Sequence, residues 1–122
     1  MNKNLMFDSI FFEKKAPSNR QLRVSQAIKN ELSIMLVSGA LFHPEIENTY
    51  LTIAHVKITP DLRLATIYIA VHDDSRTQAY LEALRLLVPN MRRVIGSSIR
   101  LKYTPEIKLR SVSYAESIVH HT

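Results

Sequence analysis

The sequence predicts a two-layer α+β domain with the element order helix, strand, strand, helix, helix, strand. Three observations predict it. Apolar residues recur at helical spacing in three segments, they alternate with polar residues in three others, and prolines or glycines separate most of these segments. The chain has 122 residues and no cysteine, a length at which one domain can bury a core without disulfides. A three-stranded sheet with the helices packed on one face satisfies this pattern.

The first helix is expected to begin after Ser18 and to end at Gly39. Ser18 is a residue type that caps helix starts, and Gly39 can adopt the left-handed conformation that ends a helix. One apolar stripe runs along this segment at the spacing of a buried helix face: Val24, Ala27, Ile28, Leu32, Met35 and Leu36.

Two strands should follow as an antiparallel hairpin. Residues 50–59 alternate, with Val56 and Ile58 on one face and His55 and Lys57 on the other. The tight connection TPDLR leads into residues 64–71, which alternate again and place Tyr68 on the outer face.

The second and third helices meet at a proline. Ser75 or Thr77 is expected to cap the second helix, whose packing residues are Ala79, Leu81, Ala83, Leu84 and Leu87. Pro89 stops or kinks that helix near Leu87, and Asn90 is expected to cap the third helix. The third helix should face inward with Met91, Val94, Ile95, Ser98 and Ile99.

The third strand follows Pro105, with Ile107 and Leu109 alternating with Lys108 and Arg110. The expected organisation is a leader over residues 1–17, a folded domain over 18–113 and a short tail over 114–122. No apolar run approaches the roughly 18 to 20 residues of a membrane span, and the absence of cysteine fits a reducing cytoplasm.

The positive charge is segregated along the chain. The net charge is +5, and residues 91–110 alone carry six Lys or Arg against one Glu, whereas residues 31–90 carry four against seven acids. This segregation indicates a polyanionic partner, with a solvated basic face as the alternative.

The third helix should present arginines around small residues, opposite its apolar stripe. Gly96 lies among them, and glycine inside a helix costs about 1 kcal/mol relative to alanine. Close approach of a phosphate backbone and a tight helix crossing both account for it. Since arginine forks pair with phosphate oxygens, we expect a continuous cationic surface for RNA. The candidate RNA-binding residues are Arg20, Arg23, Arg92, Arg93, Gly96, Arg100, Lys102, Lys108 and Arg110.

Catalysis, metals and small-molecule substrates find little support in the sequence. His43 and His55 are isolated, and His120 and His121 fall in the expected tail. The adjacent residues His72, Asp73 and Asp74 read as a solvated turn at a strand end. With two glycines in the chain, no Gly-rich phosphate loop is possible, so neither an enzyme nor a cofactor is expected.

Three motifs in order carry a family resemblance: SNRQLRVSQAIKNELSIML (Ser18 to Leu36), VKITPDLRLATIYIAV (Val56 to Val71) and MRRVIGSSIRLKYTPEIKL (Met91 to Leu109). The element order resembles that of the bacterial, type II KH domain, and the motifs resemble the ribosome-binding factor A family. That family lacks the GxxG loop of KH domains and typically has an Ala-x-Gly kink between its second and third helices. Here the region reads Leu87, Val88, Pro89, Asn90, so the kink is expected near Pro89.

The resemblance implies a monomeric, cytoplasmic, non-enzymatic protein that binds the 30S ribosomal subunit and 16S rRNA. It implies a role in ribosome biogenesis, in late rRNA processing and in cold adaptation. The long charged tail of many members is not present in this sequence. The alternative is a protein-interaction or regulatory module that uses the first helix or a strand edge and whose basic surface is incidental.

Overall fold

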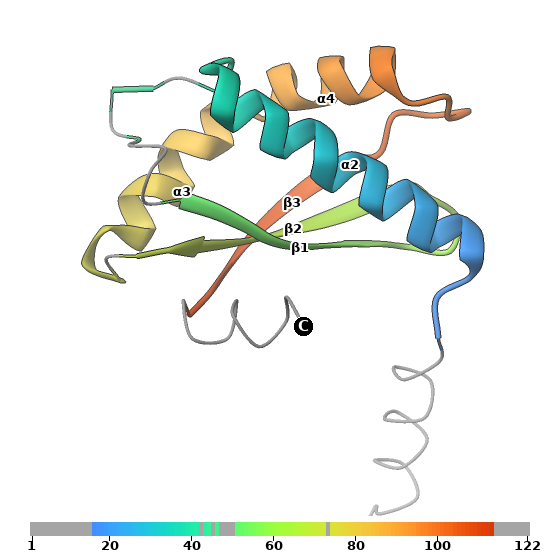
Figure 1. Ribbon diagram of the computed structural model, residues 1–122, viewed down its shortest axis with the longest axis horizontal. Helices are drawn as coiled ribbons and strands as arrows, with labels where there is room; N and C mark the ends of the chain where they lie inside the picture. Colours follow the sequence, from blue (N-terminus) through green and yellow to red (C-terminus); the bar gives the residue numbers. More distant parts are fainter. Residues whose placement is uncertain (1–15, 42, 45, 47–50, 73, 114–122) are drawn as a thin grey trace, which may run out of the picture.

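Three helices cover one face of a three-stranded sheet (Figure 1). The computed structural model describes residues 16–41, 43–44, 46, 51–72 and 74–113. Its elements are α2 (Asn19–Ser38), β1 (Leu51–Ile58), β2 (Leu64–Val71), the short 3₁₀ helix η2 (Asp74–Arg76), α3 (Thr77–Leu86), α4 (Val88–Ser98) and β3 (Glu106–Val112). The predicted α+β class and element order are confirmed.

Some sequence predictions lie outside the described residues. They concern the leader up to residue 15, the tail from residue 114, Asp73, and the histidines His120 and His121.

Helix α2 begins and ends as its sequence predicts. The Ser18 hydroxyl accepts a hydrogen bond from the Gln21 amide at 3.1 Å, and the Gln21 side chain accepts one from the Ser18 amide at 2.9 Å. This reciprocal capping box satisfies two amides that a helix start otherwise leaves unpaired. At the other end Gly39 has φ 84°, and its amide donates to the carbonyl of Leu36.

The sheet has β2 at its centre. Strand β1 pairs with β2 antiparallel, as the hairpin prediction requires, and β3 pairs with β2 parallel on the other side. The register shifts between Ile53 and His55, so Ala54 forms an irregularity at which the strand bends. His55 and Lys57 are exposed on the face away from the helices, as predicted.

The connection between β1 and β2 is held by side-chain hydrogen bonds to its own backbone. The Thr59 hydroxyl donates to the Asp61 carboxylate at 2.6 Å, and the Arg63 amide donates to the same carboxylate oxygen at 3.0 Å. Both hydrogen bonds stabilise the charged carboxylate and so lower the pKa of Asp61 below its usual value, with the bond from Thr59 having the larger effect. Leu62 has φ 62°, a strained conformation for leucine, and its side chain is buried.

One residue separates α3 from α4. Leu87 caps the end of α3 and the start of α4. Its amide donates to the carbonyl of Leu84, and its carbonyl accepts from the amide of Met91. The predicted break near Pro89 is thus confirmed, but the predicted cap at Asn90 is wrong because α4 already begins at Val88. Proline in the first turn of α4 has a preset φ and no amide to satisfy, so a helix can start there without a side-chain cap.

The core lies between the helices and the sheet, and most predicted inward residues belong to it. Ser98 is exposed, so its inward placement was wrong. Five other predicted inward residues are partly buried: Ala27, Ala79, Leu87, Val94 and Ile99, of which the last three pack against the core. Helix α3 has Arg76 as its N-cap without a side-chain capping hydrogen bond, so the predicted cap from Ser75 or Thr77 is wrong. Tyr80 is buried on the same helix face as Ala83 and Leu84.

Candidate nucleic-acid interface

The outward side of α4 carries exposed polar and cationic residues. Arg93 is exposed and donates a hydrogen bond to the side chain of Asn90, one turn earlier. The Asn90 side chain also donates to the carbonyl of Ala40 at 3.3 Å, which connects α4 to the end of α2. An open groove of about 610 Å³ follows the end of the helix, and its lining residues are Gly96, Ser97, Ser98, Ile99, Arg100, Leu101 and Lys102. Two of these residues are cations and none is an acid.

Arg92 differs from Arg93, the other arginine of α4, because backbone carbonyls hold its guanidinium. Its Nε donates to the carbonyl of Pro105 at 3.0 Å, and its Nη2 donates to the carbonyl of Thr104 at 3.2 Å. The same Nη2 lies 3.4 Å from the Glu106 carboxylate. Arg92 thus fastens α4 to the segment that leads into β3, and part of its capacity to pair with phosphate is already used.

Gly96 has a packing reason visible in the structure. A Cβ built at this position would lie 2.8 Å from the hydroxyl oxygen of Thr104, closer than carbon and oxygen atoms approach each other. The segment 99–105 therefore passes against the helix at this point. This contact accounts for the glycine by close approach of the chain itself, whereas the sequence left phosphate approach and a tight crossing open.

The substitution Gly96→Ala should therefore destabilise the fold, although alanine favours helices. The gain in helix propensity is about 1 kcal/mol, and the cost of overpacking is typically about 1 to 3 kcal/mol. We expect a net loss of about 1 kcal/mol in the free energy of unfolding, measured by urea denaturation. Combining it with Thr104→Ala removes the clashing hydroxyl, so in that background the same substitution should be neutral or stabilising. An equal loss in both backgrounds would contradict this account.

Sequence reasoning missed Arg63, which joins the candidate Lys102 and Tyr103 in a cationic and aromatic cluster. The guanidinium of Arg63 lies 4.3 Å from the centroid of the Tyr103 ring, and the ammonium of Lys102 lies 5.5 Å from it. Tyr103 is 49% exposed. Arg63 lies in the hairpin connection TPDLR, far from Tyr103 in the sequence. The only sequence signal for its part in the cluster was its positive charge. We call these three residues the Tyr103 cluster.

The first turns of α2, the β1–β2 connection and the segment between α4 and β3 lie at the same end of the molecule (Figure 1). The side chain of Gln21 donates to the carbonyl of Ile58 at 2.9 Å, which places this part of α2 beside the hairpin connection. Arg20 and Arg23 are both exposed there. Their charges therefore add to the positive potential at this end.

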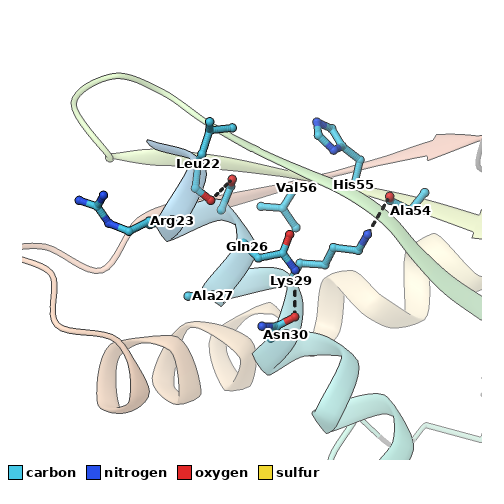
Figure 2. A pocket seen from close by; sticks show the side chains of 10 residues that line it. Leu22, Arg23, Gln26, Ala27, Lys29, Asn30, Ala54, His55 and Val56 are labelled. Carbon is cyan, nitrogen blue, oxygen red and sulfur yellow. Dashed lines mark hydrogen bonds between the residues drawn. The ribbon is translucent and has the colours of Figure 1, made fainter. Parts of the chain in front are cut away.

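An open groove of about 780 Å³ lies between α2 and β1, and Figure 2 shows its lining side chains. Arg23 extends from α2 into solvent, and Lys29 reaches across to donate to the carbonyl of Ala54 at 3.3 Å. His55 projects from the strand on the side away from the helix. Lys29 binds the carbonyl of Ala54 at the irregularity of β1. The edge of β1 is therefore protected at this groove against pairing with a strand of another chain.

Lys108 and Arg110 do not share a surface with the arginines of α4. They alternate along β3 with Leu109, which is buried under the helices, so they lie on the outer face of the sheet. The expectation of one continuous cationic surface is therefore wrong. The candidate residues divide between the helical layer, which carries Arg20, Arg23, Arg92, Arg93, Gly96, Arg100 and Lys102, and the outer face of the sheet, which carries the other two.

The described residues also bear on metal sites and membrane spans. Among them, no three His, Asp or Glu side chains come together in a way that could hold a metal ion. No helix in this part of the chain is both long enough and apolar enough to cross a membrane.

Comparison with known proteins decides the family. The family model described as ribosome-binding factor A matches residues 20–118, which include every described helix and strand apart from the first residue of α2. The chain belongs to the ribosome-binding factor A family. The resemblance seen in the three sequence motifs is confirmed.

Curated relatives agree with this assignment. The chain is 33% identical over 100 residues to ribosome-binding factor A of Ruegeria sp. (strain TM1040), which covers 82% of this chain and 76% of the relative. It is 34% identical over 94 residues to ribosome-binding factor A of Dinoroseobacter shibae, which covers 77% and 70%.

Solved structures share the fold of this ribosome-binding factor A family member. The solution structure of a candidate ribosome binding factor A from Thermotoga maritima superposes with a TM-score of 0.67 at 22% identity, covering 79% of this chain and 90% of that one. The crystal structure of ribosome-binding factor A from Thermus thermophilus gives 0.63 at 16% identity, covering 75% and 94%. At these identities the likeness supports the KH-like fold alone.

Proposed function

We propose that this chain is a non-catalytic ribosome assembly factor that binds immature 30S subunits and 16S rRNA and promotes late maturation of that RNA. The observation that carries the proposal is a set of exposed cations on and just after α4. Arg100 and Lys102 line a groove whose described lining residues include no acid, and Arg93 is exposed on the helix itself. Membership of the ribosome-binding factor A family supports a ribosomal partner. The protein would act as a cytoplasmic monomer, and a role in cold adaptation is part of the proposal.

The cations would supply affinity and orientation through the phosphate backbone. Without a GxxG loop the domain cannot clamp a single strand in the way of KH domains, so base-by-base reading is not expected at α4. Selectivity would come from the shape of the folded rRNA. By binding one RNA conformation better than the alternatives, the protein would shift the population toward that conformation without making or breaking a bond.

The alternative, a protein-interaction module, has one observation in its favour. Ile34 and Val37, near the end of α2, are 58% and 89% exposed. The edge of β1 is less suited to a partner strand, because Lys29 occupies the Ala54 carbonyl and the strand is irregular there. The alternative therefore rests on α2 rather than on the edge of β1.

The salt dependence of binding separates the two functions. If about four cations contact phosphates, the logarithm of the affinity for small-subunit RNA should fall against the logarithm of salt concentration with a slope of roughly −3 to −4. Fluorescence anisotropy with labelled 16S rRNA fragments would give this slope. Arg85→Gln, an exposed arginine on α3, is the matched control and should leave the slope unchanged. Absence of RNA binding, or an affinity independent of salt, would favour the protein-interaction module.

A further inference from the structure

The outer face of the sheet carries an ordered array of cationic and aromatic side chains. The pairing register aligns His55, Tyr68 and Arg110 in one row across the three strands, and Lys57, Thr66 and Lys108 in the next. The rings of His55 and Tyr68 lie in tilted contact with centroids 5.9 Å apart, which confirms that they share this face. We call Lys57, Tyr68, Lys108 and Arg110, together with His55, the sheet-face array.

The spacing of the array follows from sheet geometry. Strands lie about 4.8 Å apart, and residues on one face of a strand repeat about every 6.7 Å. Lys57 and Lys108, on the two outer strands of one row, therefore have their Cα atoms about 10 Å apart, and Tyr68 lies between them in the neighbouring row. Three cations thus surround one aromatic ring at distances that their long side chains can span.

The outer face of the sheet is positively charged. Lys57, Lys108 and Arg110 are exposed. The three strands contain one acid, Glu106, at the start of β3. Its carboxylate lies 3.4 Å from the Arg92 guanidinium, so it is already paired at the end of the face. The face consequently favours an anionic ligand.

We propose that the sheet-face array binds a segment of single-stranded RNA distinct from the RNA bound at α4, with one base stacked on Tyr68 and phosphates paired with Lys57, Lys108 and Arg110. This inference rests on the proposed function and extends it. Since the array and the α4 cations lie on opposite layers, one molecule would hold two RNA segments together.

The chemistry favours a single strand over other anionic partners. The Tyr68 ring is half-buried, so part of it is accessible to an unpaired base, whereas the bases of a duplex are stacked on one another and out of reach. An acidic protein segment would pair with the cations but would make no use of the ring. Binding of single-stranded RNA and binding of an acidic protein segment give different results in the experiment below.

Binding of a labelled oligouridylate of about 12 nucleotides, within the usual range of single-strand site sizes, to the full-length protein tests the proposal. The double substitution Lys108→Gln/Arg110→Gln should weaken binding by about tenfold and make the salt slope shallower by about 1.4, because each lost phosphate contact on a single strand contributes about 0.7. Tyr68→Leu should also weaken binding by about tenfold, since base stacking on an aromatic ring is of that order. Tyr68→Phe keeps the ring and should bind as the unsubstituted protein does, and so should the control Arg85→Gln.

Three further results would overturn the inference. Unchanged oligouridylate affinity in Lys108→Gln/Arg110→Gln and Tyr68→Leu would exclude the array as an RNA site. Equal losses for Tyr68→Leu and Tyr68→Phe would exclude stacking. If the array variants bound RNA normally but lost binding to a ribosomal protein, the partner would be a protein. Each variant must also keep the melting temperature of the unsubstituted protein, so that lost binding is not lost folding.

Failure of this inference and failure of the proposed function are distinguishable. If the unsubstituted protein binds small subunits and loses them on Arg93→Gln/Arg100→Gln, the proposed function holds whatever the array does. If the unsubstituted protein binds neither small subunits nor RNA, the proposed function itself fails.

Discussion

Replacing Arg93 and Arg100 with glutamate is expected to abolish co-sedimentation with small ribosomal subunits while leaving the fold intact. The double change reverses the charge of Arg100, which lines the groove at the end of α4, and that of Arg93 on the helix itself, and both side chains are exposed. Losing two phosphate contacts and adding two repulsions should lower the affinity by at least about a hundredfold at moderate salt. Exposed substitutions of this kind alter the free energy of unfolding by about 0.5 kcal/mol or less, so the melting temperature should move by no more than about 4 °C.

A sucrose gradient of a cell lysate, probed for this chain, measures the effect. The unsubstituted protein should migrate with free small subunits and be absent from translating ribosomes, and the variant should remain at the top of the gradient. Arg85→Glu is the matched control, because it reverses an exposed charge on α3, and it should migrate with small subunits. Retention of the double variant on small subunits would show that the α4 cations are not the contact.

The second large effect concerns stability. Arg92→Met should lower the free energy of unfolding by about 2 kcal/mol, because the carbonyls of Thr104 and Pro105 lose their charged donors in a partly buried place. For a domain of this size that loss corresponds to a fall in melting temperature of about 8 to 16 °C. Methionine keeps most of the aliphatic stem, so lost packing contributes little.

Urea denaturation of Arg92→Met beside Glu106→Gln separates the two kinds of contact. Glu106→Gln removes the ion pair alone, and since its side chain is 74% exposed we expect a loss below about 0.5 kcal/mol. Equal losses in the two variants would mean that the ion pair matters more than the carbonyl contacts. An unchanged free energy of unfolding in Arg92→Met would show that the carbonyl contacts do not stabilise the fold, and Arg92 would again be a candidate for pairing with phosphate.

Most of the fold was predictable because local signals and the tertiary structure agree. The capping box at Ser18, the left-handed Gly39 and the alternation of the hairpin are each decided by residues within a few positions of one another. The start of α4 was not predicted correctly, because Asn90 is a good cap by type but Pro89, one residue earlier, already suits a first turn. The burial of Tyr80 was not predicted, although Tyr80, Ala83 and Leu84 lie at the spacing of one helix face.

The candidate site was less predictable because its residues meet through tertiary contacts. The alternation of Lys108 and Arg110 with Leu109 could be read from the sequence, but their separation from Arg93 and Arg100 depends on which side of the sheet α4 covers. The pairing of Arg63 with Tyr103 joins two connections that adjoin only once β3 lies beside β2. No short-range pattern contains that information.

The parallel pairing of β3 with β2 has a consequence for the newly made protein. Glu106 donates its amide to the carbonyl of Arg63, so the last strand closes against a connection synthesised much earlier, after two helices have intervened. Before β3 has been synthesised, the chain therefore lacks the strand that completes the sheet and, with it, the fixed carbonyls that bind Arg92. The contacts that hold Arg92 should accordingly form late, only after β3 has been synthesised.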